Sequence, residues 1–141
     1  MDEGSQPKNR AVLVVEDDHD VRQIIAEAIA DTGRQVFTAQ DGTEALRLLD
    51  SPHVPRPCLI LLDWTMAPMG GAAFLEQLEG RNDFDQLPIL VTSGSPSVGP
   101  SSSVFPGVVG TLQKPFDLED LLAVLDEHCP PPFVGRLDEH P

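Results

Sequence analysis

The sequence predicts an α/β domain built on a five-stranded parallel sheet that is doubly wound, with helices on both faces. Five short apolar runs alternate with stretches of helical periodicity along the chain. Continuously apolar strands are typical of parallel sheets covered by helices on both sides. With 141 residues, of which 40% are hydrophobic, the chain is long enough for one such domain and too short for a second catalytic domain.

The strands are predicted from five short runs rich in apolar and β-branched residues, most of them bounded by polar residues or turn formers. Right-handed crossovers between parallel strands leave few ways of winding these runs into one sheet. The runs are Ala11 to Val15, Gln35 to Ala39, Cys58 to Leu62, Ile89 to Val91 and Val108 to Leu112.

Four helices are predicted from apolar residues spaced three and four apart. The first ends at Gly33, the second (Thr43 to Asp50) follows an Asp41-Gly42 turn, the third follows Gly70-Gly71, and Asp117 is expected to cap the last. The residues expected to face inward are Val21, Ile24, Ile25, Ala28 and Ile29, then Ala45, Leu46 and Leu49, then Phe74, Leu75 and Leu78, and finally Leu118, Leu121, Leu122 and Leu125.

The helix that the alternation requires between the fourth and fifth strands is expected to be degenerate or missing. Its place is taken by Gly94 to Gly107, fourteen residues that include five Ser, three Gly and three Pro. Such a composition does not sustain an amphipathic helix, so we expect a loop or a single ragged turn.

The chain is predicted to comprise an N-terminal tail (1–9), one domain (10–129) and a Pro-rich, acidic C-terminal tail (130–141). Its formal charge of −14 disfavours direct binding to nucleic acid or to anionic lipid headgroups. No apolar stretch is long enough for membrane insertion, and the first ten residues lack the apolar core of a signal peptide.

The two cysteines are too few and too far apart in the sequence to suggest a zinc motif or a disulfide framework. Cys58 lies in an apolar run, where it is expected to act as a small hydrophobic residue. A reducing cytoplasm is therefore the expected location.

Polar residues follow four of the predicted strands: Glu16 and Asp17, then Asp63, Thr92 and Lys114. Because the carboxyl ends of parallel strands form one edge of the sheet, these side chains should converge there. Two carboxylates about 4 Å apart repel by about 4 kcal/mol at an effective dielectric constant of about 20. A hard divalent cation with oxygen ligands would remove this repulsion, and Mg²⁺ is the usual ion where phosphate is involved.

Lys114 supports a phosphoryl site, because the chain has seven Arg but only one other Lys, at position 8. Its ammonium can neutralise one phosphoryl oxygen while the Thr92 hydroxyl donates to another. Asp63 then remains as the nucleophile, since a carboxylate can form an acyl phosphate.

Four segments of the chain resemble the signature blocks of the response-regulator receiver domain of two-component signalling. They are VLVVEDDHDVR, LILLDWTMAPMGG, ILVTSG and LQKPF. The resemblance implies a flavodoxin-like fold with strand order 2-1-3-4-5. It also implies a cis Lys114-Pro115 bond. The roles it implies are Mg²⁺ binding by Glu16 and Asp17, phosphoacceptor and third metal ligand for Asp63, a backbone carbonyl ligand from Thr65, a hydroxyl switch for Thr92 and phosphate binding by Lys114.

The same resemblance implies a phosphoacceptor that takes its phosphoryl group from a histidine kinase or a histidine phosphotransfer protein and signals to an unknown downstream protein. No stand-alone enzyme is expected, only catalysis of its own phosphorylation and dephosphorylation. Two residues depart from the family pattern: Ala67 replaces a usual proline, and Thr111 replaces a usual Tyr or Phe.

These departures leave open an alternative function, a receiver-like scaffold that binds its partner without phosphorylation. A hydrolase with an aspartyl nucleophile, of the haloacid-dehalogenase type, is a third possibility. That family has a second Asp two residues after the nucleophile, where this chain has Thr65.

Overall fold

The computed structural model describes residues 11–66, 70–81, 87–94 and 107–130. In these ranges a parallel five-stranded sheet has the strand order β2-β1-β3-β4-β5. In chain order the elements are β1 (Ala11–Val15), α1 (His19–Ala30), β2 (Gln35–Ala39), α2 (Gly42–Asp50), β3 (Leu59–Asp63), α3 (Gly71–Glu79), β4 (Ile89–Ser93), β5 (Val108–Gln113) and α4 (Leu118–His128). The predicted fold class and strand order are therefore confirmed.

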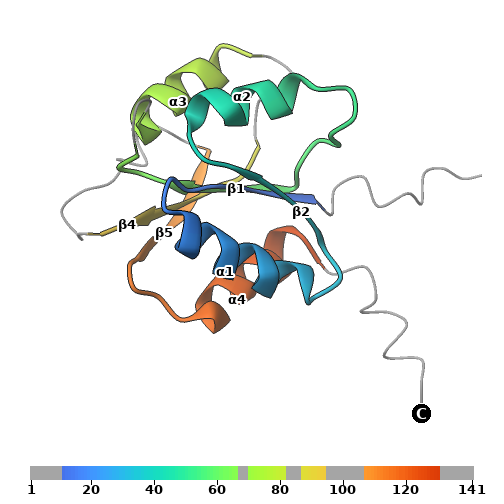
Figure 1. Ribbon diagram of the computed structural model, residues 1–141, viewed down its shortest axis with the longest axis vertical. Helices are drawn as coiled ribbons and strands as arrows, with labels where there is room; N and C mark the ends of the chain where they lie inside the picture. The colour runs from blue at the N-terminus through green and yellow to red at the C-terminus, as the bar shows by residue number, and fades with distance from the viewer. Residues whose placement is uncertain (1–10, 67–69, 82–86, 95–106, 131–141) are drawn as a thin grey trace, which may run out of the picture.

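The helices cover both faces of the sheet: α2 and α3 lie on one side, and α1 and α4 on the other (Figure 1). Each side has its own apolar cluster, because successive strand residues point to opposite faces. Leu13 and Val15 of β1 belong to the cluster under α2 and α3, whereas Val12 and Val14 pack with α1 and α4. The three central strands, β1, β3 and β4, are buried along their whole length.

Local side-chain hydrogen bonds determine where the first two helices begin. Asp18 accepts a hydrogen bond from the backbone N–H of Val21 at 3.1 Å, and Asp41 accepts one from Glu44 at 2.8 Å. These bonds satisfy N–H groups that have no partner within the helix. Gly33 has a φ of 91°, a left-handed conformation that favours glycine and directs the chain from α1 into β2.

Three details of the predicted helices need correction. Ile24 is 58% exposed, because it lies about 100° around α1 from Ile25, which faces the sheet. Leu118 is 37% exposed in the first turn of α4, where it borders a surface hollow that Ile24 also lines. Asp117 occupies the N-cap position of α4, but its side chain makes no capping hydrogen bond.

The structure also corrects the expectation that the two cysteines are too far apart in the sequence to suggest a disulfide. Cys58 and Cys129 form a disulfide, with their Cα atoms 5.5 Å apart. They are 71 residues apart in sequence, but the return of α4 along the sheet brings its carboxyl end to the amino end of β3. The degenerate helix predicted over 94–107 lies mostly in 95–106, outside the described residues.

None of the helices in the described ranges has the length and the apolar character that a membrane span requires.

Candidate functional site

The candidate site lies at the carboxyl edge of the sheet, where β1, β3, β4 and β5 end. Asp63, the last residue of β3, is the register partner of Thr92 on β4. Both residues are almost fully buried, with exposed fractions of 3% and 1%. A backbone hydrogen bond from Trp64 N–H to the Thr92 carbonyl oxygen, at 2.9 Å, extends this pairing past the end of β3. Strand pairing therefore places the carboxylate and the hydroxyl residue next to each other.

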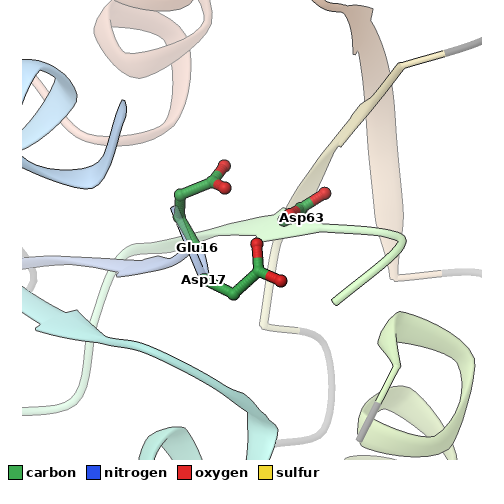
Figure 2. A group of neighbouring side chains, drawn as sticks. All are labelled: Glu16, Asp17 and Asp63. Carbon is green, nitrogen blue, oxygen red and sulfur yellow. The ribbon is translucent and has the colours of Figure 1, made fainter. Parts of the chain in front are cut away.

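Three carboxylates gather at this edge (Figure 2). Glu16, Asp17 and Asp63 each offer an oxygen atom, and these atoms lie within 4.8 Å of one another. Glu16 and Asp63 are buried, whereas Asp17 is exposed. Figure 2 shows Glu16 and Asp17 leaving the loop after β1 in different directions, with Asp63 coming from the neighbouring strand.

The donor set fits a hard divalent cation. Three carboxylates at this spacing repel one another strongly where burial lowers the local dielectric constant. All the donors are oxygen atoms, which Mg²⁺ prefers. The exposure of Asp17 leaves the cluster open to solvent on one side, as Mg²⁺ requires because it usually keeps several water ligands.

Lys114 reaches the same cluster from the end of β5. Its Nζ donates to Glu16 Oε1 at 2.8 Å and lies 3.5 Å from Asp63 Oδ2. Its backbone N–H donates to the Ser93 carbonyl oxygen at 2.7 Å, which ties the loop after β5 to the end of β4. The Lys114-Pro115 peptide bond is cis, as predicted.

The electrostatic environment shifts two pKa values. Burial raises the pKa of the Glu16 carboxyl above its ordinary 4.5, and the Asp63 charge adds to this effect, while hydrogen bonds from Lys114 and Asp18 oppose it. Burial lowers the pKa of Lys114, but the hydrogen bond to Glu16 and the negative charges of Glu16 and Asp63 outweigh it. The pKa of the ammonium therefore lies above its ordinary 10.5. Lys114 is a cation throughout the neutral range.

Two further contacts hold the acidic loop in place. Arg22 Nη1 donates to the Glu16 carbonyl oxygen at 2.9 Å, and the Asp18 N–H donates to Glu16 Oε2 at 3.1 Å. The sequence patterns did not single out Arg22. Its position could have indicated a role, because a cation near the start of a helix interacts unfavourably with the helix dipole and is expected there only if it makes another contact.

Thr65 lies on the exposed side of the cluster, and its backbone N–H donates to Asp63 Oδ1 at 3.3 Å. The use of its carbonyl oxygen as a metal ligand stays a prediction. Thr111, which stands where the resembled family often has Tyr or Phe, is exposed on β5. Ala67 lies outside the described residues.

Comparisons with known proteins agree with this arrangement. The family model for the response regulator receiver domain matches residues 12–126. Response regulator MprA of Mycolicibacterium vanbaalenii is 40% identical over 113 residues, which are 79% of this chain and 47% of the relative. Response regulator MprA of Mycobacterium tuberculosis is 38% identical over the same share of each chain. The chain thus spans about half the length of the curated relatives it matches.

Solved structures show the same fold. The chemotaxis protein CheY4 of Vibrio cholerae superposes with a TM-score of 0.72 at 29% identity, over 85% of this chain and 98% of that one. A response regulator receiver protein from Pseudomonas putida superposes with a TM-score of 0.73 at 27% identity, over 84% and 97%.

Proposed function

This chain belongs to the response regulator receiver domain family, and on that premise we propose that Asp63 accepts a phosphoryl group from the phosphohistidine of a histidine kinase or histidine phosphotransfer protein. The observation that carries the proposal is the position of Asp63: its carboxylate lies within 4.8 Å of the Glu16 and Asp17 oxygens and 3.5 Å from Lys114 Nζ. Such a carboxylate is both a nucleophile and part of a cation site.

The chemistry follows from the residues in place. An Asp63 oxygen forms a bond to phosphorus while the P–N bond of the phosphohistidine breaks, and its electron pair stays on the imidazole. The Lys114 ammonium, held beside Asp63, neutralises one phosphoryl oxygen, and the Thr92 hydroxyl donates to another. Water later attacks phosphorus, which releases inorganic phosphate and restores the carboxylate. The activity is confined to this self-phosphorylation and to hydrolysis of the resulting acyl phosphate.

Glu16, Asp17 and Asp63 would hold Mg²⁺, with Thr65 as a backbone ligand. The bound ion would supply the positive charge that offsets the three carboxylates and the incoming phosphoryl group. We place the transfer in the cytoplasm. The output is a contact with a downstream protein, with no part for nucleic acid or for insertion into a membrane.

The proposal is tested by intact mass spectrometry after incubation with phosphoramidate, in Mg²⁺ or in EDTA. The wild type should gain a single phosphoryl group in Mg²⁺ alone. Asp63→Asn should gain none, while Asp120→Asn, the same chemical change at an exposed position on α4, should behave as the wild type does.

The second candidate function is recognition of a partner without phosphorylation. The exposed Thr111 on β5 favours it, because no aromatic side chain stands there to move with the hydroxyl residue. A folded sample that binds Mg²⁺ but gains no phosphoryl group would reject the phosphoacceptor proposal in favour of this scaffold.

A further inference from the structure

The disulfide between Cys58 and Cys129 lies at the opposite edge of the sheet from the acidic cluster. Cys58 directly precedes β3, and Cys129 directly follows α4. Five residues of β3 separate Cys58 from the edge that carries Asp63, about 16 Å along the strand. The chain contains no other cysteine, so the two sulfurs can only pair with each other or with another molecule.

Contacts that do not involve sulfur hold both cysteine backbones in position. The Cys58 N–H donates to the Ala11 carbonyl oxygen at 2.8 Å. The Cys129 carbonyl oxygen accepts a hydrogen bond from Arg34 Nε at 2.6 Å, and the Arg34 guanidinium also pairs with Asp126 at 2.7 Å. The side chain of Arg34 is 1% exposed. The two Cα atoms therefore stay 5.5 Å apart for reasons independent of the S–S bond.

The surroundings also suit the reduced form. Cys58 Sγ lies 3.2 Å from the Ala11 carbonyl oxygen, so a thiol there has a hydrogen-bond acceptor. Both cysteines also belong to the apolar cluster under α1 and α4. A buried thiol is well tolerated in such a cluster. The same fold thus accommodates either two thiols or one disulfide.

We propose that Cys58 and Cys129 are a reversible redox pair that fastens the carboxyl end of α4 to the amino edge of the sheet. Oxidation proceeds by exchange with a low-molecular-weight disulfide such as glutathione disulfide. One cysteine thiolate attacks that disulfide, which expels one glutathione thiolate and leaves a mixed disulfide. The second cysteine displaces the other, so two protein thiols become one S–S bond as one glutathione disulfide becomes two thiols. Reduction by a dithiol is the reverse exchange.

Access to the pair is controlled by the last turn of α4. Cys129 is fully buried and Cys58 is 7% exposed, so an attacking thiolate reaches the bond only when this turn opens. The bond from Arg34 to the Cys129 carbonyl oxygen and the pair of Arg34 with Asp126, in the same turn, together hold it closed. Protein disulfides in reducing compartments are mostly of this transient, redox-responsive kind.

The first experiment equilibrates the full chain in buffers of varied ratio of reduced to oxidised glutathione and quenches the exchange with acid. The thiols are then labelled with N-ethylmaleimide in denaturant, which exposes both cysteines, and the intact mass is measured. We expect a change between two and zero labels within the range that glutathione buffers cover, with the same circular dichroism at both ends. Two labels even in excess glutathione disulfide, zero labels in native protein with excess dithiothreitol, or only mixed or intermolecular disulfides would each overturn the proposal.

Thermal unfolding tests whether the bond acts as a brace. The bond closes a loop of 71 residues, so reduction of the wild type should lower Tm by roughly 10 to 20 °C. Hydrogen exchange should rise more in the last turn of α4 than in β3. Cys58→Ala should show no redox dependence of Tm. If that variant does not fold, the comparison of oxidised and reduced wild type is sufficient. An equal Tm in the two redox states would refute the claim that the disulfide stabilises the fold.

A separate experiment tests whether the ion pair of Arg34 with Asp126 limits access to the disulfide. Asp126→Asn removes the one carboxylate that pairs with Arg34 in the described residues, and it should raise the rate of reduction by dithiothreitol at least about threefold over wild type. Glu127→Gln, the matched change at the next exposed position, should leave this rate unaltered. Equal rates in all three proteins would contradict the control of access by this turn.

Discussion

Lys114 Nζ donates to Glu16 Oε1 at 2.8 Å, a shorter contact than its 3.5 Å approach to Asp63 Oδ2. The Lys114 ammonium is thus hydrogen-bonded mainly to Glu16, and Asp63 is its more distant neighbour. A phosphoryl group on Asp63 would present new negative oxygens beside the same ammonium. Lys114 therefore contacts both Glu16 and Asp63, and its replacement should slow phosphorylation of Asp63.

Lys114→Ala should slow phosphorylation by phosphoramidate about 100-fold, because the developing charge on the phosphoryl oxygens loses its preorganised cation. The phosphorylation rate of Lys114→Arg should lie between those of wild type and Lys114→Ala, since a planar guanidinium does not reproduce a compact ammonium. The time course of intact mass measures both rates. Lys8→Ala, a change at the only other lysine of the chain, is the control and should match wild type. An unimpaired Lys114→Ala would remove Lys114 from the chemistry.

Mg²⁺ affinity should weaken as the pH falls, and the decline should begin above the pH at which an ordinary glutamate takes up its proton. Burial raises the pKa of Glu16, so its carboxylate is protonated earlier on acidification, and the proton competes with the metal. Titration calorimetry between about pH 8 and about pH 5 would measure the decline.

Glu16→Gln supplies the control for this pH dependence. It should bind Mg²⁺ more weakly at neutral pH, and its affinity should vary less across the same range because the competing proton site is gone. A wild-type affinity that stays constant down to about pH 5 would show that Glu16 does not take part in binding the ion.

Gly71→Ala should destabilise the domain by about 1 to 3 kcal/mol, as overpacking does in well-packed cores. A Cβ at position 71 would lie 2.5 Å from Trp64 Cε3 and 3.1 Å from Trp64 Cα, so backbone as well as ring must move. Urea unfolding followed by the fluorescence of Trp64, the single tryptophan, measures the loss. Gly80→Ala is the matched control, because its nearest neighbour is 3.6 Å away and its φ is −76°. Equal midpoints for the two variants would contradict the predicted clash.

Arg34→Leu should cost about 2 to 4 kcal/mol in reducing buffer, where the disulfide no longer contributes. The substitution leaves the Cys129 carbonyl oxygen without the bond from Arg34 Nε in a buried position. Asp126→Asn should cost less than about 1 kcal/mol, because the Asp126 side chain is 66% exposed and water replaces much of the interaction. Denaturant unfolding midpoints of the two variants measure these losses of stability. A larger loss for Asp126→Asn would mean that the ion pair, not the bond to the carbonyl, holds α4.

Much of the architecture was predictable because its signals are local. The run AVLVV is apolar on both faces, so it had to be a covered strand, and the acidic residues after it had to lie at the carboxyl edge of the sheet. The convergence of Glu16, Asp17, Asp63 and Lys114 follows from the same reasoning, and the structure brings these groups together.

The departures arise where periodicity does not specify which neighbour covers a residue. Ile24 satisfies a helical stripe, but the sheet and α4 cover the Ile25 side of α1 and leave Ile24 largely exposed. Leu118 follows the same spacing in α4 and is partly exposed for the same reason: coverage ends at the surface hollow between the two helices.

The sequence by itself determined the α/β alternation, the parallel sheet and the edge at which its charged residues meet, because strand and helix periods act over a few residues and parallel pairing aligns the strand ends. Only the tertiary structure decided that Cys58 meets Cys129 and that Arg34 reaches the end of α4. These partners are 71 and 95 residues apart. Their contact depends on how far α4 runs back along the sheet, and no local pattern encodes that distance.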